Sequence, residues 1–136
     1  MTDLALAQVD AFAEGDRPFF IGCHYWEPHA PYLPTEDFKD RYDPATIPPW
    51  PSFQDDGAGR PRWHERMRRQ VFPGAARAGW AEWSRVVARY YGMAAMVDHE
   101  IGRLLDGLRD RGLYDDLLIV FASDHGDTVG IHGGMF

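Results

Sequence analysis

The chain has 136 residues, the size of one modest domain, and 45% of them are hydrophobic, so we expect a globular fold with a core. Its net charge of −7 argues against nucleic acid as a partner, because binding to a phosphate backbone requires clustered cations. No stretch approaches the roughly 20 consecutive apolar residues of a membrane-spanning helix, so no membrane association is expected either.

The first part of the chain predicts a short helix followed by a strand. Apolar residues at helical spacing indicate an amphipathic helix over residues 4–13, which Gly15 ends. Residues 18–24 are apolar almost throughout, as in a strand that is covered on both faces. Cys23 is interpreted as a buried residue of this strand. It is the only cysteine, so an internal disulfide is excluded.

A long proline-rich loop is predicted next, from about residue 26 to residue 79. Its prolines, dense between Pro28 and Pro51, exclude a long helix or a central strand. Loops of this length inside a compact domain are usually functional or serve as linkers. Residues 60–69, R-P-R-W-H-E-R-M-R-R, form either a solvated face or a rim that attracts an acidic substrate.

The second part of the chain predicts a long helix and a second strand. Apolar residues recur at steps of three and four between residues 79 and 111, which indicates one buried face of a helix. Residues 117–122, L-L-I-V-F-A, are typical of another buried strand. The order strand, loop, helix, strand belongs to parallel α/β sheets, so the predicted fold class is α/β with the two strands paired and the helix packed on them.

The motif S-D-H-G-D at residues 123–127 directly follows the second predicted strand. Ligand sites of open α/β sheets lie beyond the carboxyl ends of the strands. Asp124 offers a carboxylate and His125 an imidazole nitrogen, and Gly126 allows the loop to turn both toward one ion. Oxygen donors suit calcium, magnesium or manganese, and the added nitrogen favours manganese or zinc. The alternative is a turn or helix cap without a ligand.

Two further histidines lie in loops that could bring them to a substrate. His29 stands in P-H-A-P, whose prolines restrict the backbone, so its imidazole could donate to an anionic oxygen or protonate a leaving group. The alternative is a surface histidine in a proline turn. His132 lies in G-I-H-G-G, where glycines allow close approach to a ligand, or simply form a flexible loop end.

Three segments together resemble the sulfatase branch of the alkaline-phosphatase-like superfamily. They are P-F-F-I-G-C-H-Y-W-E-P-H-A-P-Y, R-Y-Y-G-M-A-A-M-V-D-H-E-I-G-R-L-L-D-G-L and L-L-I-V-F-A-S-D-H-G-D-T-V-G-I-H-G-G, in the family's order. The resemblance implies that Asp124 and His125 are metal ligands. It implies that His29 is catalytic and contacts the sulfate or its leaving oxygen, and that His132 binds substrate. The cofactor it implies is a divalent metal, with calcium as first choice and manganese as the alternative.

The chain also departs from the family's pattern. Sulfatases carry a Cys/Ser-x-Pro-x-Arg segment whose first residue becomes the formylglycine nucleophile, and this sequence contains no such segment. The paired acidic metal ligands of the family's first strand and a lysine beyond the second metal segment are missing as well. Residues 1–136 are therefore expected to be a partial sulfatase domain of the alkaline-phosphatase-like sandwich type, cut at both ends and inactive by itself.

The activity expected of a full-length relative is metal-dependent hydrolysis of a small anionic sulfate ester. One alternative is a phosphodiesterase or phosphonate hydrolase of the same superfamily, and another is a truncated remnant without catalysis. The N-terminus has no basic start followed by an apolar core, so no signal peptide is predicted and the cytoplasm is the default location.

The predicted topology places His29 in one site with Asp124 and His125, although about 95 positions separate them in the sequence. Neighbouring parallel strands end at the same edge of a sheet, and the long helix would be the crossover between them. An anion could then bridge His29 and a metal bound to Asp124.

Overall fold

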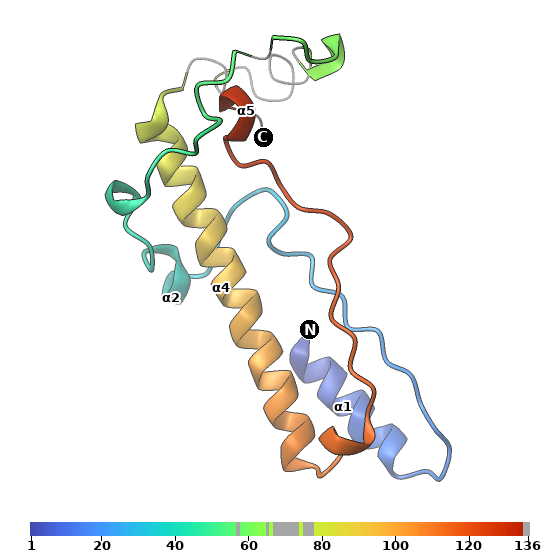
Figure 1. Ribbon diagram of the computed structural model, residues 1–136. Helices are drawn as coiled ribbons and strands as arrows, with labels where there is room; N and C mark the ends of the chain where they lie inside the picture. The colour runs from blue at the N-terminus through green and yellow to red at the C-terminus, as the bar shows by residue number, and fades with distance from the viewer. Residues whose placement is uncertain (57, 65, 67–73, 75–77, 135–136) are drawn as a thin grey trace.

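The computed structural model describes residues 1–56, 58–64, 66, 74 and 78–134, and it is organised around one long helix (Figure 1). This helix, α4, spans Trp80–Asp110 and has 31 residues. The other elements, in chain order, are α1 (Thr2–Ala13), α2 (Glu36–Lys39), the 3-10 helices η1 (Pro44–Thr46) and η3 (Tyr114–Asp116), and α5 (Ile131–Gly134). In the described ranges no helix is long and apolar enough to cross a membrane.

Helix α4 confirms the helix predicted from the periodicity of residues 79–111. It begins after Gly79 and ends at Asp110. Arg111 caps it, and Gly112 follows with a φ of 67°, a conformation that glycine adopts without strain. Its buried face supplies Val87, which is fully buried, and Met93. These two side chains form a core cluster with Tyr32 and Val129, so the centre of the chain is held by α4, the proline-rich segment and the C-terminal segment.

Helix α1 confirms the short helix predicted at the N-terminus, and it runs parallel to the last third of α4. The Oγ1 of Thr2 donates to the carbonyl of Glu100, the Arg103 guanidinium lies 2.6 Å from Asp3, and Arg111 binds the Asp10 carboxylate at 2.5 Å. The contacts occur in the same order on both helices, which fixes the parallel direction. Surface pairs of this kind contribute little to stability, so they orient α1 more than they hold it.

The parallel sheet predicted from the two apolar runs is not formed. None of the described residues is in a β-strand, and both runs are extended segments without helix or strand assignment. The side chains of residues 19–26 alternate between half-buried and exposed, so Cys23 is half-buried rather than buried, and Phe20 is 91% exposed. In the second run Leu118 and Phe121 are 92% and 80% exposed. The predicted fold class, α/β, is therefore wrong for this structure, which is helical.

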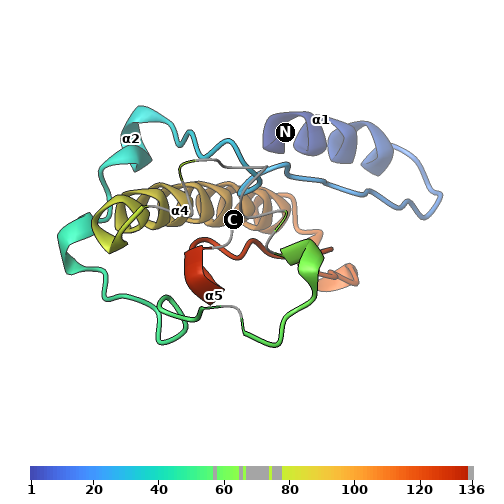
Figure 2. The ribbon, with the colours of Figure 1, turned by 90° about the horizontal axis from the view of Figure 1, so that it is seen from above.

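The absence of the sheet has a physical reason. Parallel sheets are stable when several strands pair and both faces are covered, and two strands on their own are marginal. Here two segments are available, and the side chains of residues 118–122 are all exposed, so no layer of described residues covers the second segment. Figure 2 shows α1 and α4, the two longest helices, from above. On the helix face expected to pack on a sheet, Leu108 is buried and Val97, Ile101 and Leu104 are half-buried. Helix α1 packs on the adjoining face, where Leu6 meets Gly107.

The predicted direction of the two segments is nevertheless observed. Residues 18–26 return from the end of α1, residues 117–127 return from the end of α4, and both run in the same direction (Figure 1). His29 contacts His125, and Tyr32 contacts Asp127, so the two segments arrive at the same place in matching order. Helix α4 is therefore the connection between two parallel segments, as the sequence predicted.

The proline-rich segment expected at residues 26–79 contains α2 and η1, and both lie against α4. The indole of Trp80 donates to the carbonyl of Ile47 at 2.9 Å, which ties the start of α4 to the residue after η1. At Gly92 the backbone of α2 comes so close that a Cβ atom would lie 2.6 Å from the carbonyl oxygen of Phe38. Glycine is therefore required at this crossing.

We predict that Gly92→Ala destabilises the chain, whereas Gly107→Ala does not. A Cβ at Gly92 meets the backbone of Phe38 and the ring of Pro34, which cannot move without displacing α2. This overpacking costs about 1–3 kcal/mol and outweighs the gain of about 1 kcal/mol in helix propensity. A Cβ at Gly107 meets only the tip of the Leu6 side chain, which can rotate.

Thermal unfolding followed by circular dichroism measures the difference. The melting temperature should fall for Gly92→Ala and stay equal or rise for Gly107→Ala. Equal effects of the two substitutions would show that α2 does not pack on α4 at Gly92.

Candidate active site

The structure brings His29 and His125 together. Their ring centroids lie 6.1 Å apart with an interplanar angle of 74°, and the Trp26 ring packs on His29 at 4.7 Å. His29 follows the first parallel segment and His125 lies near the end of the second, so the predicted meeting of the two loops is confirmed for this pair. It occurs at the ends of two extended segments rather than at the edge of a sheet.

Backbone carbonyls orient both imidazole rings in the same way. The Nδ1 atom of His29 lies 2.7 Å from the carbonyl oxygen of Ala30, and Nδ1 of His125 lies 3.3 Å from that of Gly126. Carbonyl oxygens only accept hydrogen bonds, so each Nδ1 carries the proton and donates it. In the neutral rings the lone pair is then on Nε2, the atom available to a metal or a substrate.

Asp124 lies directly beside His125. Its Oδ1 accepts a hydrogen bond from the backbone amide of His125 at 3.0 Å, and its Oδ2 lies 3.8 Å from Nε2 of that histidine. The hydroxyl of Ser123 donates to the carbonyl of His125 at 2.6 Å and closes the turn. The side chains of Asp124 and His125 are 90% and 60% exposed. One carboxylate oxygen and one imidazole nitrogen are thus accessible side by side.

These donors suit a divalent cation in kind but are few in number. Calcium takes six to eight oxygen ligands, and other divalent ions also need more than two protein groups for firm binding. Among the described residues, no group of three or more histidine, cysteine, aspartate or glutamate side chains is close enough to hold a metal. Asp124 and His125 can therefore supply part of a coordination shell.

The contact between Tyr32 and Asp127 was not predicted from the sequence. The Tyr32 hydroxyl donates to Oδ2 of Asp127 at 2.9 Å, and the Trp50 indole donates to the carbonyl of Val129 at the same distance. Both bonds tie the loop after His125 to the proline-rich segment. The available signals were the position of Asp127 in S-D-H-G-D and of Tyr32 directly after P-H-A-P, but neither spacing indicates that the two would pair.

Burial governs the ionisation of the tyrosines around this contact. Burial raises the pKa of the Tyr32 phenol, and the hydrogen bond to the Asp127 carboxylate and its charge raise it further. Burial also raises the pKa of Tyr90, whose ring packs on Tyr32 at 5.5 Å, and the Asp127 charge adds to it. Near neutral pH both phenols therefore stay protonated, and Tyr32 remains a hydrogen-bond donor to Asp127.

His132 contacts a different set of side chains. Its Nδ1 lies 2.7 Å from the Arg60 guanidinium, which also binds the Asp55 carboxylate, and its backbone amide donates to the Ser52 hydroxyl at 3.3 Å. Arginine only donates, so Nδ1 of His132 accepts. Arg60 opens the predicted basic stretch of residues 60–69, of which 65 and 67–69 lie outside the described residues. Arg60 itself is neither a solvated residue nor free, because it holds Asp55 and His132.

Loop histidines and an aspartate thus converge at the ends of two extended segments, and comparison with known proteins identifies the family. The sulfatase family model matches residues 1–135. This chain belongs to the sulfatase family.

Three individual relatives are each 28% identical to this chain over the aligned residues. The chain is 28% identical over 121 residues to an arylsulfatase of Clostridium perfringens, covering 85% of this chain and 24% of the relative. It is 28% identical over 142 residues to human iduronate 2-sulfatase, covering 97% of this chain and 26% of the relative. The multifunctional alkaline phosphatase superfamily protein PehA of Trinickia caryophylli is 28% identical over 128 residues, or 85% and 25% of the two chains. The chain thus spans about a quarter of the length of these relatives.

We predict that Tyr32→Phe makes the stability of the chain less sensitive to alkaline pH. A phenol whose pKa is raised by folding stabilises the folded state fully below the unfolded pKa of about 10, and this contribution is lost as pH rises above it. The variant should have a lower melting temperature than the wild type at pH 8, because it loses the hydrogen bond to Asp127. Between pH 8 and pH 11 its melting temperature should fall less.

Tyr42→Phe is the matched control, because it removes a hydroxyl from a partly exposed ring and leaves the Asp127 contact intact. An equal pH dependence for wild type and Tyr32→Phe would contradict the assigned role of this phenol.

Proposed function

We propose that this chain supplies part of the active site of a metal-dependent sulfuric ester hydrolase. The observation that carries the proposal is the contact between His29 and His125, two rings from distant loops, in a chain of the sulfatase family. In this proposal Asp124 and His125 contribute ligands to a divalent metal and His29 acts on the substrate. His132 binds the substrate from the loop that carries it.

The metal role is supported by the chemistry and exposure of the donors. The Oδ2 of Asp124 and Nε2 of His125 lie 3.8 Å apart on exposed side chains, and Nδ1 of His125 is directed to a backbone carbonyl. A divalent cation bound there, calcium or manganese, would withdraw charge from the oxygens of a sulfate ester. The remaining ligands would have to come from groups outside this constellation.

The proton-transfer role of His29 is supported by the way its ring is held. The hydrogen bond from Nδ1 to Ala30 and the Trp26 ring fix the plane of the imidazole, so Nε2 is the atom that meets a ligand. When the ring is protonated, Nε2–H can donate to the leaving oxygen of an ester as the bond to sulfur breaks. The exposed position of His29 leaves that atom accessible.

A second candidate function is hydrolysis of a phosphodiester or phosphonate. The similarity to PehA, a multifunctional member of the alkaline phosphatase superfamily, favours it. An imidazole and a divalent metal can serve either anion, because both esters place negative oxygens around the reacting atom. The ratio of turnover on the two ester classes separates these candidates.

We predict that the 136-residue chain alone does not hydrolyse 4-nitrophenyl sulfate, whereas a chimaera does. The sequence lacks the Cys/Ser-x-Pro-x-Arg segment that would carry the nucleophile. In the chimaera, the part of this chain that aligns with the Clostridium perfringens arylsulfatase replaces the matching segment of that protein. His29→Ala in this background should lower kcat by about 100-fold or more, the usual contribution of a general acid.

His24→Ala, which removes an exposed histidine outside the pair, is the control and should leave kcat unchanged. Bis(4-nitrophenyl) phosphate as a parallel substrate tests the second candidate function. Turnover by the isolated chain, or a folded chimaera in which His29→Ala has no effect, would contradict the proposal.

We predict that Mn²⁺ binds weakly beside Asp124 and His125 in the isolated chain. Titration with Mn²⁺ should broaden the NMR ring signals of His125 and His29 at concentrations several-fold lower than those that broaden the other histidine rings, because the paramagnetic ion relaxes nearby protons. Asp124→Asn should remove this preference, and Asp115→Asn on η3 serves as a control that leaves it unchanged. Equal broadening of all six histidine rings would exclude a metal preference at this site.

A further inference from the structure

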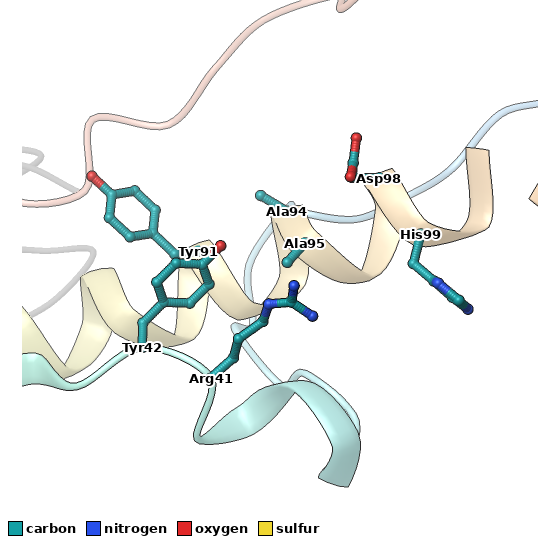
Figure 3. A pocket seen from close by; sticks show the side chains of 7 residues that line it. All are labelled: Arg41, Tyr42, Tyr91, Ala94, Ala95, Asp98 and His99. Atoms are coloured by element: carbon teal, nitrogen blue, oxygen red, sulfur yellow. The ribbon is translucent and has the colours of Figure 1, made fainter. Parts of the chain in front are cut away.

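A surface groove of about 550 Å³ lies between α4 and the chain that follows α2 (Figure 3). Arg41 and Tyr42 line it from the loop, and Tyr91, Ala94, Ala95, Asp98 and His99 line it from α4. None of these residues belongs to the His29 and His125 pair or to the Asp55, Arg60 and His132 contacts. A volume of this size matches the usual range for small-ligand sites.

One end of the groove is aromatic and already packed. The rings of Tyr42 and Tyr91 lie edge to face, with centroids 5.5 Å apart and an interplanar angle of 66°. No flat ligand can stack between them in that arrangement, but their exposed edges and faces can contact the C–H groups of a saturated ring. The floor is low because Ala94 and Ala95 project little from the helix.

The middle and far end of the groove are charged. Figure 3 shows the Arg41 guanidinium reaching from the loop toward α4, between the tyrosines and the pair Asp98 and His99. Among the described residues Arg41 makes no ion pair, and its guanidinium carbon lies over the Phe38 ring, 5.8 Å from the ring centroid. Asp98 is exposed, and no described residue forms an ion pair with it. The groove thus presents a cation and a carboxylate that are both available to a ligand.

We propose that this groove binds a sugar ring that carries an anionic group. The tyrosines would pack on the ring, the Arg41 guanidinium would bind the anion with charge-assisted hydrogen bonds, and Asp98 would accept from ring hydroxyls. A flat aryl anion would pair with Arg41, but it has no hydrogen-bond donors for the Asp98 carboxylate. A neutral sugar would leave Arg41 unpaired.

The choice of a sulfated sugar as the first probe rests on the proposed function. The groove is a site separate from the one that contains His29, and the two are linked through α4. The ring of Tyr91 lies 6.4 Å from that of Tyr90, which packs on Tyr32, the partner of Asp127. An acidic saccharide held in the groove would therefore be anchored on the same turn of α4 that supports the loop after His125.

The test is an NMR titration of the ¹⁵N-labelled 136-residue chain with galactose 6-sulfate, glucuronic acid, galactose and 4-nitrophenyl sulfate. Galactose 6-sulfate and glucuronic acid should shift the amides of residues 41–42 and 91–99, and whichever binds more tightly identifies the sulfate or the carboxylate as the preferred anion. Galactose should bind more weakly than either. Arg41→Gln should raise the Kd of the acidic sugars by about tenfold, as expected for loss of a charge-assisted contact.

Arg85→Gln is the matched control, because it removes an exposed arginine of α4 outside the groove and should not change the Kd. The proposal is overturned if acidic sugars do not shift the groove amides, if Arg41→Gln has no more effect than Arg85→Gln, or if 4-nitrophenyl sulfate binds there as well as galactose 6-sulfate. None of these results bears on turnover by the chimaera, so failure of this site and failure of the proposed function are distinguishable.

Discussion

The packing of α1, α2, η1 and η3 on different sides of α4 is the constraint on which the described structure depends. Helix α4 is the longest described element, and the cluster of Val87, Met93, Tyr32 and Val129 is where three parts of the chain meet. Removal of apolar area from water is the main favourable term in folding, so this cluster sets the position of the loops that it holds. The glycine at position 92 extends the same contact to α2, because it lets the backbone of Phe38 approach the helix directly.

The sequence correctly predicted the helices, which depend on residues close together in the chain. It failed for the strands, which form only when segments distant in the chain pair with each other. Both α1 and α4 follow from the period of their apolar residues, although α1 buries Val9 and leaves Leu4 exposed. The runs at 18–24 and 117–122 have the composition of buried strands, but composition cannot supply the neighbouring strands and the second covering layer that a parallel sheet requires. The direction of the segments was predictable because it depends only on the order of elements along the chain.

The candidate site shows the same division. His29 and His125 could be placed together because each follows an extended segment, and their contact at 6.1 Å needs no sheet. Tyr32 and Asp127 could not be paired from the sequence, since many arrangements of two loops would have kept them apart. One turn of α4 contacts both the loop that carries Tyr32 and the groove. Tyr90 faces Tyr32 beneath the loop of His125, and Tyr91, the next residue, faces Tyr42 in the groove.

The exposure of residues 117–122 has a consequence for the chain in solution. The six residues L-L-I-V-F-A have high β-propensity and carry no charge, proline or glycine, and Leu118, Val120 and Phe121 are each more than three-quarters exposed. Among the described residues no backbone hydrogen bond involves residues 117–122, so their amides and carbonyls can pair with another extended segment, which is the situation from which cross-β assembly begins. The acidic charges that flank the run at Asp115, Asp116 and Asp124 act as gatekeepers, because stacking copies in register would bring like charges together. Colloidal behaviour of the isolated chain should therefore depend strongly on ionic strength, since salt screens that repulsion while leaving the apolar attraction in place.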